Sequence, residues 1–512
     1  MDTARITDPA AVSAPALAAA PAATPAAPTD QSAAPTDQGA APTDQGAAPT
    51  DQSAARAPVV TRPSLAQLLA LALPIVVSRS SQVVVGFTDA AMVGQLSQAA
   101  LAATTAGATN AFNVLVLPMG MVFVVQSFAS QLTGRGDAAG ARRYGWYGLG
   151  IAALTQVACL ASLPFLSAAV ALFDYSAEVQ GLMATYLWWR LLSGGAAIGL
   201  EALASYYGGL GNTRLPMLAQ LVVMVLNLAL CWVLIYGNLG APALGVAGSA
   251  MAASAATTIG FALLFGCFVL GVGCGARRAT GFSLRDAWRV VKIGVPSGFN
   301  WFIEFAAFSF FLNVVLPGLG TTTIAAMMSV IQLNSVSFMP AFALASSGAI
   351  FVGQAIGADR RDDVPRTVWL AMAAAAGWMG LLAVVYVVAP RFFLSAFVAE
   401  GAPDAAQFLD VGARILLLSC AWQLFDAASM VLSEALRAAG DTLATFVARG
   451  VIAWGVFVPG AWLSVRRYGG GDVEAVFWLA AYLAVLAVVL LLRFRSGRWR
   501  SIVLTDDVSL PG

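Results

Sequence analysis

From Leu65 onwards the chain is a succession of apolar stretches, separated by short segments that contain glycine, proline and arginine. Each stretch is about 20 residues or longer, the length that an α-helix needs to cross ~30 Å of hydrocarbon. The second and eighth stretches are too long for one upright helix, so we expect tilting, or kinks at Pro118 and Pro340. We predict an all-α polytopic membrane protein with twelve transmembrane helices, at about 65–93, 99–130, 144–173, 182–206, 215–237, 243–272, 286–315, 322–355, 366–390, 405–435, 443–464 and 474–493.

The two halves of this pattern resemble each other. Similar segments recur 222 to 229 residues apart, pairing Pro74 with Pro296, Pro118 with Pro340, Gln131 with Gln354, Gly134 with Gly357, and Gly211 with Gly440. Six helices per half is an even number, so the repeats run parallel about an axis along the membrane normal. We predict two pseudo-symmetric six-helix lobes, an N-lobe (63–280) and a C-lobe (281–495), followed by a cytoplasmic C-terminal tail (496–512). Two such lobes are typical of alternating access, and one compact twelve-helix bundle without transport is the alternative.

Residues 1–62 differ in composition from the rest, being rich in Ala, Pro, Thr, Asp and Gln. A seven-residue repeat, PTDQ-[SG]-A-A, begins at Pro28, Pro35, Pro42 and Pro49. A proline in every copy excludes a coiled coil, and prolines also interrupt each apolar stretch that a signal peptide would need. We therefore predict a disordered N-terminal tail.

Composition excludes several classes of function. Hydrophobic residues make up 59% of the chain and charged residues 10%, with mean hydropathy +0.79, whereas a soluble domain has about 25% charged residues. The net charge of +1 argues against nucleic-acid binding. The chain has no histidine, and its single lysine, Lys292, lies outside any phosphate-binding loop motif. The five cysteines form no CxxC and are interpreted as packing thiols. We predict neither an enzyme nor a bound cofactor.

The basic residues predict the orientation. Of 27 basic residues, we count 20 on the flanks of one side of the predicted helices, whereas only Arg391, Arg466 and Arg467 flank the other side. Arg79, Arg190 and Arg414 fall inside or at the ends of spans. By the positive-inside rule, both termini are predicted to be cytoplasmic.

Five acidic residues fall within the predicted spans: Asp89, Glu201, Glu304, Asp426 and Glu434. A carboxylate near the bilayer centre costs at least ~2.5 kcal/mol, so each requires an explanation. We interpret Glu201 and Glu434, nearer the cytoplasmic ends, as structural. Asp89, Glu304 and Asp426 are candidates for binding a coupling cation, either as groups that exchange protons or, with neighbouring oxygens, as ligands for Na⁺. Na⁺ at Glu304 and Asp426 is the metal alternative.

The surroundings of these acids suggest a cavity. Asp89 shares a helical face with Gln82, Ser81 and Ser78, which predicts contact with an aqueous cavity, although a position near a helix end also permits snorkelling. Glu304 shares its face with aromatic residues and Asn300, a setting that attracts organic cations. The alternative is that these aromatics only pack. Further candidate cavity residues are Asn110, Asn227, Trp301, Gln332 and Gln423, although amides also act as hydrogen-bonding contacts between helices.

Several segments in order resemble the MATE (multidrug and toxic compound extrusion) transporters. They are LALPIVVSRSSQVVVGFTDAAMVGQLS, YGNLGAPALGVAGSAMAAS and the paired loops GLGNT and AAGDT. The segments WFIEF and LFDAAS are similar to the bacterial NorM-type branch, and the resemblance covers about residues 63–495. It implies that Asp89, Glu304 and Asp426 match the family's acids in the first, seventh and tenth helices. Asn227 matches the first of two family asparagines, and Cys231 departs from the second.

The resemblance implies a monomeric antiporter of the bacterial inner membrane that exports amphipathic organic cations in exchange for H⁺ or Na⁺. Its partners are then small-molecule drugs and membrane lipid. A lipid-linked precursor flippase of the same superfamily is the alternative, but it should carry basic residues in its cavity, whereas the ionisable residues inside the predicted spans are chiefly acids. A major-facilitator transporter is disfavoured because GRGDAAGARR lacks that family's loop spacing. A channel fits the asymmetric buried acids less well.

Overall fold

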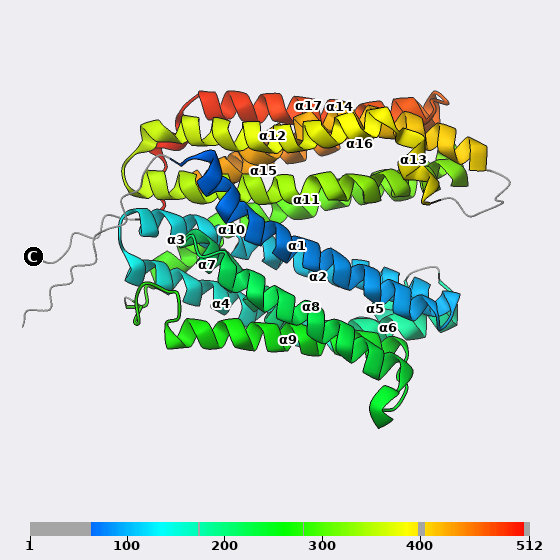
Figure 1. The fold of residues 1–512 in the computed structure, drawn as a ribbon, viewed down its shortest axis with the longest axis horizontal. Coiled ribbons are helices and arrows are strands. Elements are labelled where there is room, and N and C mark those ends of the chain that lie inside the picture. Colours follow the sequence, from blue (N-terminus) through cyan, green and yellow to red (C-terminus); the bar gives the residue numbers. More distant parts are fainter. Residues whose placement is uncertain (1–62, 173–174, 280, 398–404, 506–512) are drawn as a thin grey trace, which may run out of the picture. The chain divides into compact units, whose positions relative to one another are not determined.

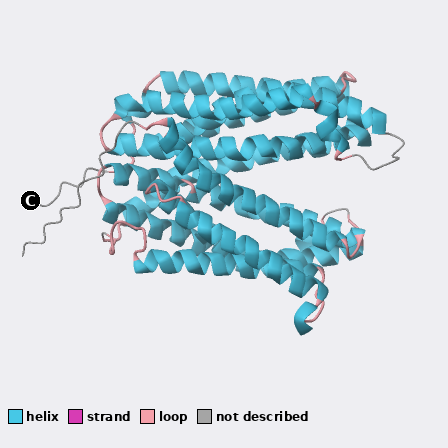
Figure 2. Ribbon diagram, viewed as in Figure 1, coloured by secondary structure: helices cyan, strands magenta, loops and turns pink. Residues whose placement is uncertain are grey.

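The structure, a computed structural model, describes residues 63–172, 175–279, 281–397 and 405–505. Every regular element within these ranges is a helix (Figure 2). The predicted disordered tail (residues 1–62) and the last seven residues of the predicted C-terminal tail lie outside the described residues.

Within the described ranges, five helices begin at a side chain that caps them by accepting a hydrogen bond from a backbone N–H three residues on. The caps are Ser64, Ser97, Asp137 and Ser176 in the first half and Ser283 in the second. The first half comprises α1 (Leu65–Gly94), α2 (Gln98–Val122), α3 (Val124–Gly134), α4 (Ala138–Ser162), α5 (Leu166–Val170), α6 (Ala177–Leu192), α7 (Gly194–Gly209), α8 (Arg214–Tyr236) and α9 (Val246–Leu270).

The second half repeats this arrangement with longer continuous helices. It comprises α10 (Leu284–Phe310), α11 (Thr321–Gly357), α12 (Val364–Val388), α13 (Pro390–Ser395), α14 (Ala405–Ala439), α15 (Thr442–Ile452), α16 (Val458–Trp462) and α17 (Asp472–Arg495). Short π-helical segments belong to these helices. Phe311–Val315 extends α10, Ala453–Phe457 joins α15 to α16, and Leu463–Arg467 extends α16.

The prediction of twelve membrane-spanning helices is confirmed. Within the described residues, eleven helical segments are long and apolar enough to cross a membrane. The fourth span is made of α6 and α7, 16 residues each, which are broken at Ser193. The second span also breaks, at Phe123, five residues after Pro118, whereas α11 contains Pro340 and runs as one helix of 37 residues.

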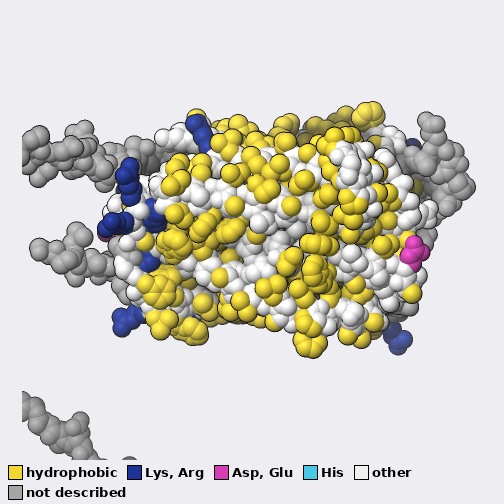
Figure 3. Space-filling view, turned by 90° about the horizontal axis from the view of Figure 1, so that it is seen from below, with side chains coloured by type: hydrophobic (Ala, Val, Ile, Leu, Met, Phe, Trp, Pro, Cys, Tyr) yellow, Lys and Arg dark blue, Asp and Glu magenta, His cyan; other side chains and the backbone are white. Residues whose placement is uncertain are grey.

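The helices gather in two groups, α1 to α9 and α10 to α17, which we call the N-lobe and the C-lobe. Contacts are densest within each group, and the main contacts between groups pair α1 and α3 with α11, and α2 with α10 (Figure 1). Hydrophobic side chains cover most of the face in Figure 3, and arginine and lysine gather at its ends. Most lie at one end, that of the loops after α3, α9 and α11 and of the segment after α17, which we call the arginine-rich end.

The two lobes meet through matching residues of the sequence repeat. Gln131 of α3 donates to the carbonyl of Ala438 at 2.8 Å, and Gln354 of α11 donates to the carbonyl of Gly209 at 3.4 Å. A Cβ atom at Gly357 would overlap the carbonyl of Gln131, so the backbones approach as closely as glycine allows. A Cβ atom at Gly134 would likewise overlap the carbonyl of Gln354. The same short motif from each half therefore packs against its counterpart.

Candidate functional site

The largest described cavity lies within the C-lobe and has a volume of about 550 Å³. Its walls are formed mainly by α10, α11, α14 and α17, and Phe112 and Val116 of α2 complete them from the N-lobe. Nearly half of the lining residues are aromatic or methionine, including Trp301, Phe305, Phe308, Phe338, Phe342, Trp422, Met327, Met339, Met379 and Met430. A cavity of this size and lining fits an amphipathic small molecule.

Two of the predicted acids, Glu304 and Asp426, line this cavity together. Glu304 forms an ion pair with Arg449 of α15, whose Nη2 also donates to the Ser433 hydroxyl at 3.3 Å. No described side chain donates a hydrogen bond to the Asp426 carboxylate. Glu434 also lines the cavity and is paired with Arg437. Of the three carboxylates in the lining, only that of Asp426 is therefore without an arginine partner among the described residues.

Three further predicted residues, Asn300, Trp301 and Gln423, line the same cavity. Gln423 donates from Nε2 to Asn334 Oδ1 at 2.9 Å. Within the described part of the chain, Asn300 Oδ1, Gln423 Oε1 and Asn334 Nδ2 are buried without a hydrogen-bond partner. Buried amide atoms of this kind are costly unless a ligand or water satisfies them, so they mark polar anchor points in an otherwise apolar wall.

Asp89 and Asn227 form a separate polar cluster inside the N-lobe. Asn227 of α8 donates to Asp89 Oδ1 at 2.7 Å, and the Cys231 thiol donates to the same oxygen at 3.1 Å. All three residues are buried, and none lines either of the two cavities described here. Cys231 lies one helical turn after Asn227, which brings both donors to one face of α8. The thiol thus acts as the second hydrogen-bond donor to Asp89.

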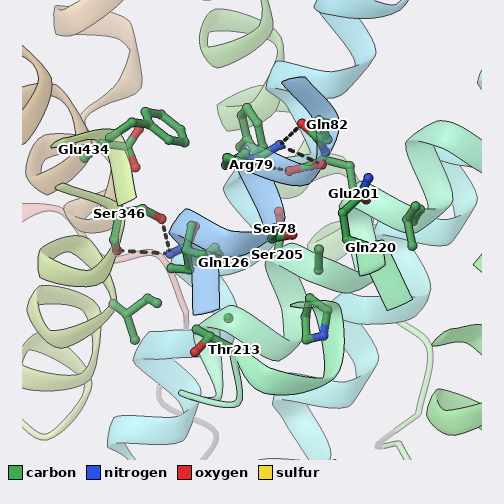
Figure 4. A pocket seen from close by; sticks show the side chains of 18 of the residues that line it. Ser78, Arg79, Gln82, Gln126, Glu201, Ser205, Thr213, Gln220, Ser346 and Glu434 are labelled. Carbon is green, nitrogen blue, oxygen red and sulfur yellow. Dashed lines mark hydrogen bonds and ion pairs between the residues drawn. The ribbon is translucent and has the colours of Figure 1, made fainter. Parts of the chain in front are cut away.

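A second, smaller cavity of about 60 Å³ lies between the lobes, toward the arginine-rich end (Figure 4). Arg79 of α1 pairs there with Glu201 of α7 and also donates to Gln82 at 3.3 Å. The Arg79 guanidinium lies 5.7 Å from the ring centroids of both Phe123 and Phe342, one from each lobe. The Arg79 guanidinium is thus held by the Glu201 carboxylate and by the faces of two aromatic rings.

A second ion pair lines the same small cavity. Glu434 and Arg437 of α14 pair with each other, and Arg437 donates across the lobe boundary to the carbonyl of Phe123 at 2.6 Å. Arg437 also donates to Gln126 Oε1 at 3.3 Å, and Gln126 donates to Ser346 Oγ at 3.2 Å. These hydrogen bonds join the lobes at the arginine-rich end.

The MatE family model matches residues 74–233 and 296–463, together more than half of the chain. The two matches begin 222 residues apart, the offset of the sequence repeat. The chain belongs to the MATE family. The prediction of a NorM-type member is confirmed by relatives called probable multidrug resistance protein NorM. The one from Neisseria meningitidis serogroup A is 30% identical, covering 83% of this chain and 92% of the relative. The one from Mesorhizobium japonicum is 28% identical, covering 86% and 96%.

Solved structures show the same MATE fold. One, described as an outward-facing conformation of a multidrug resistance MATE family transporter of the MOP superfamily, aligns with a TM-score of 0.78 at 18% identity. The alignment covers 87% of this chain and 99% of that structure. The fold that positions these cavities is therefore the twelve-helix MATE fold.

Within this MATE fold, the predicted cavity residues separate into three places. Asn300, Trp301 and Gln423 share the C-lobe cavity with the acids, Gln82 lines the cavity between the lobes, and Asn227 belongs to the Asp89 cluster. Asp89 therefore does not face the same cavity as Gln82, because it is buried against α8. Asn110 and Gln332 line neither cavity: the Asn110 amide contacts Met183 and Gln332 is exposed.

The assignment of basic residues by sequence missed two that this MATE fold buries. Arg437 and Arg449 were counted on the cytoplasmic flank, but both lie inside helices and are buried. Arg449 stands seven residues beyond Thr442, the first residue of its helix, so its position within a predicted span was a usable signal. Arg437 lies in the last turn of α14, at the arginine-rich end, so only Arg449, inside the predicted span 443–464, does not belong in the count of 20.

The same fold gives each buried glutamate an arginine. The pairs are Glu201 with Arg79, Glu304 with Arg449, and Glu434 with Arg437. Nowhere in the described residues do three acidic or thiol groups converge as they would around a metal ion. The two aspartates, Asp89 and Asp426, are the candidate acids that the fold leaves without an arginine partner among the described residues.

Proposed function

We propose that this MATE transporter is a cation-coupled antiporter that exports amphipathic, mostly cationic organic compounds across a bacterial inner membrane. The observation that supports it most is the aromatic C-lobe cavity of about 550 Å³ that contains Glu304 and Asp426 within the membrane span. A carboxylate attracts the positive group, and the surrounding rings bind the apolar body through stacking and cation–π contact. The names of the NorM relatives, probable multidrug resistance proteins, agree with this substrate class.

In this proposal, Asp89, Glu304 and Asp426 take up the coupling cation, H⁺ or Na⁺. A cation bound at Glu304 or Asp426 lowers the affinity of the C-lobe cavity for an organic cation, and the coupling is reciprocal because both ligands compete for the same negative charge. Asp89 lies in the N-lobe and the other two in the C-lobe, so coupling would involve both lobes.

The position of the contacts between the lobes supports the proposed alternating access. The hydrogen bonds of Gln126, Gln131, Gln354 and Arg437 across the lobe boundary lie toward the arginine-rich end. If this end is cytoplasmic, as the arginine distribution indicates, the structure is closed to the cytoplasm. The proposed cycle alternates this closure with closure at the opposite end, and both termini are on the cytoplasmic side.

The flippase alternative receives less support from the cavities. The charged residues that line the two cavities are three arginines and four acids. Each arginine is paired with a glutamate, so no excess of positive charge lines these walls for a pyrophosphate group. A net acidic lining supports a cationic substrate.

The test is ethidium efflux in proteoliposomes, with a pH gradient and a Na⁺ gradient imposed separately. We expect efflux driven by one gradient in the parent protein, and its loss in Asp89→Asn, Glu304→Gln and Asp426→Asn. Arg391→Gln is the matched control, because the Arg391–Asp410 pair is exposed and lies outside both cavities. Folded parent protein that moves ethidium with neither gradient would contradict the proposal and favour the flippase.

A further inference from the structure

Arg449 occupies the place in the C-lobe cavity where a small cation would bind to Glu304. Its guanidinium donates to the Glu304 carboxylate and to Ser433 Oγ. Both side chains line the cavity, and the Arg449 side chain is 8% exposed whereas that of Glu304 is 37% exposed, so the pair is buried on its arginine side and open on its carboxylate side. The arginine is thus a cation built into the wall.

A tethered guanidinium competes strongly with a free inorganic ion. Its local concentration beside Glu304 is fixed by the backbone of α15 and does not depend on the solution. A guanidinium is also weakly hydrated and loses little on leaving water, whereas a small hard cation gives up a tight hydration shell and needs several oxygen ligands at once.

A bulky organic cation, unlike a small ion, has apolar surface that packs against the aromatic lining of the cavity. Burying its apolar surface against the aromatic lining favours its binding. Contact of its charge with the faces of rings such as Trp301 and Phe308 favours it further. These terms offset the displacement of Arg449 from Glu304. The displaced guanidinium stays in a cavity that also holds the carboxylate of Asp426, since Arg449 and Asp426 both line it.

We propose that Arg449 is a specificity-determining residue of the C-lobe cavity: as the built-in counter-ion of Glu304, it excludes Na⁺ from this carboxylate and yields to bulky organic cations. Where the coupling ion is Na⁺, its uptake then falls to Asp89 and Asp426. The inference rests on the proposed function and defines which cations the same site admits.

The experiment titrates Na⁺ against the full-length protein and follows the fluorescence of tryptophan, since Trp301 and Trp422 line the cavity. N-methylglucamine replaces Na⁺ to keep ionic strength constant. We compare the parent, Arg449→Gln, Glu304→Gln and the double variant Arg449→Gln/Glu304→Gln, each with ethidium binding measured in parallel. Arg449→Lys is the conservative control because it keeps a tethered charge.

We expect no Glu304-dependent Na⁺ response in the parent or in Arg449→Lys. Arg449→Gln should gain a saturable Na⁺ response that weakens ethidium binding by roughly tenfold, about 1.4 kcal/mol, and that disappears in the double variant. A parent response to Na⁺ that Glu304→Gln abolishes would overturn the inference, as would a folded Arg449→Gln protein that binds ethidium and ignores Na⁺. If Arg449→Gln does not fold, the parent, Glu304→Gln and Arg449→Lys titrations decide. Failure of the proposed function is seen separately, as a parent protein that does not transport ethidium at all.

Discussion

At the scale of single residues, the acidic side chains within the membrane spans differ in the partners that they contact. Glu201, Glu304 and Glu434 each pair with an arginine from the membrane interior, whereas Asp89 is held by an amide and a thiol. An arginine partner favours the charged form of a carboxylate. A carboxylate that accepts hydrogen bonds only from neutral groups has no such counter-ion, so it binds a proton or a metal cation more readily. This difference separates Asp89 from the two glutamates interpreted as structural, Glu201 and Glu434, while Glu304 is a candidate coupling residue that carries an arginine partner.

Removing one partner of the Arg79–Glu201 ion pair should destabilise the protein more than removing both. Arg79→Ala leaves the buried Glu201 carboxylate without compensation, and we expect a loss of about 3–5 kcal/mol in unfolding free energy. The double variant Arg79→Ala/Glu201→Gln should recover most of it. Thermal unfolding in detergent measures both. Equal loss in the single and double variants would show that packing of Arg79 against Phe123 and Phe342 matters more than charge.

The Cys231 thiol should behave as a hydrogen-bond donor. Cys231→Ala removes one of the two donors to Asp89 Oδ1, and we expect a loss of about 1 kcal/mol in stability with reduced gradient-driven efflux. Cys231→Ser and Cys231→Asn, which keep a donor, should retain efflux. The measurement is ethidium efflux at several pH values beside thermal unfolding. Parent-like efflux in Cys231→Ala would assign the thiol to packing alone.

At the scale of helices, breaks in the long spans provide polar groups inside the membrane. At the break between α2 and α3, the Phe123 carbonyl accepts from Gln126 N–H, three residues on, at 3.2 Å, and also from Arg437 of the other lobe at 2.6 Å. In a continuous α-helix that carbonyl would accept from the N–H four residues on. The break thus turns a membrane-spanning element into one side of a contact between lobes.

The crossing of α2 and α10 depends on two glycines. A Cβ atom at Gly298 would overlap the carbonyl of Leu117, and one at Gly120 would lie 2.7 Å from Gly298 Cα. We expect Gly298→Ala to destabilise the protein by about 1–3 kcal/mol through overpacking. Gly377→Ala in α12 is the control, since a Cβ there meets nothing within 4 Å and alanine favours a helix. Thermal unfolding compares them, and equal stability of the two variants would mean that α10 shifts freely.

At the scale of the whole molecule, closure at the arginine-rich end is built from the sequence repeat used twice. Gln131 and Gln354 donate across the boundary to Ala438 and Gly209, residues that occupy matching positions in the two halves. We expect these two hydrogen bonds to form and break together, because separating the lobes at one of them also separates the lobes at the other. This contact is therefore suited to a transition between two closed states.

Gly357→Ala should weaken this closure. The added Cβ overlaps the carbonyl of Gln131, so we expect the lobes to separate at the arginine-rich end and the population to move toward the opposite closure. Distances between spin labels on the loops after α3 and α11 measure the change. Gly377→Ala again serves as the control. Unchanged label distances in Gly357→Ala would show that this contact does not hold the closed state.

The sequence alone determined the architecture and the residue types of the site. Apolar stretches of sufficient length fix twelve spans, because a backbone in hydrocarbon must satisfy its own hydrogen bonds within helices. The same cost makes each charge within a span conspicuous, which is how Glu304 and Asp426 were found beside Asn300, Trp301 and Gln423. The resemblance of the halves likewise follows from matched motifs at a constant offset.

Only the tertiary structure decided which of these groups meet. Arg449 and Glu304 are 145 residues apart in the chain, and Arg79 and Glu201 are 122 apart, so no spacing rule within one helix could pair them. The helical face of Asp89 suggested a cavity, but its burial against α8 depends on how two separate helices pack. Periodicity records which way a residue faces along its own helix, while the charge it meets is set by the neighbouring helix, and that is a property of the packed molecule.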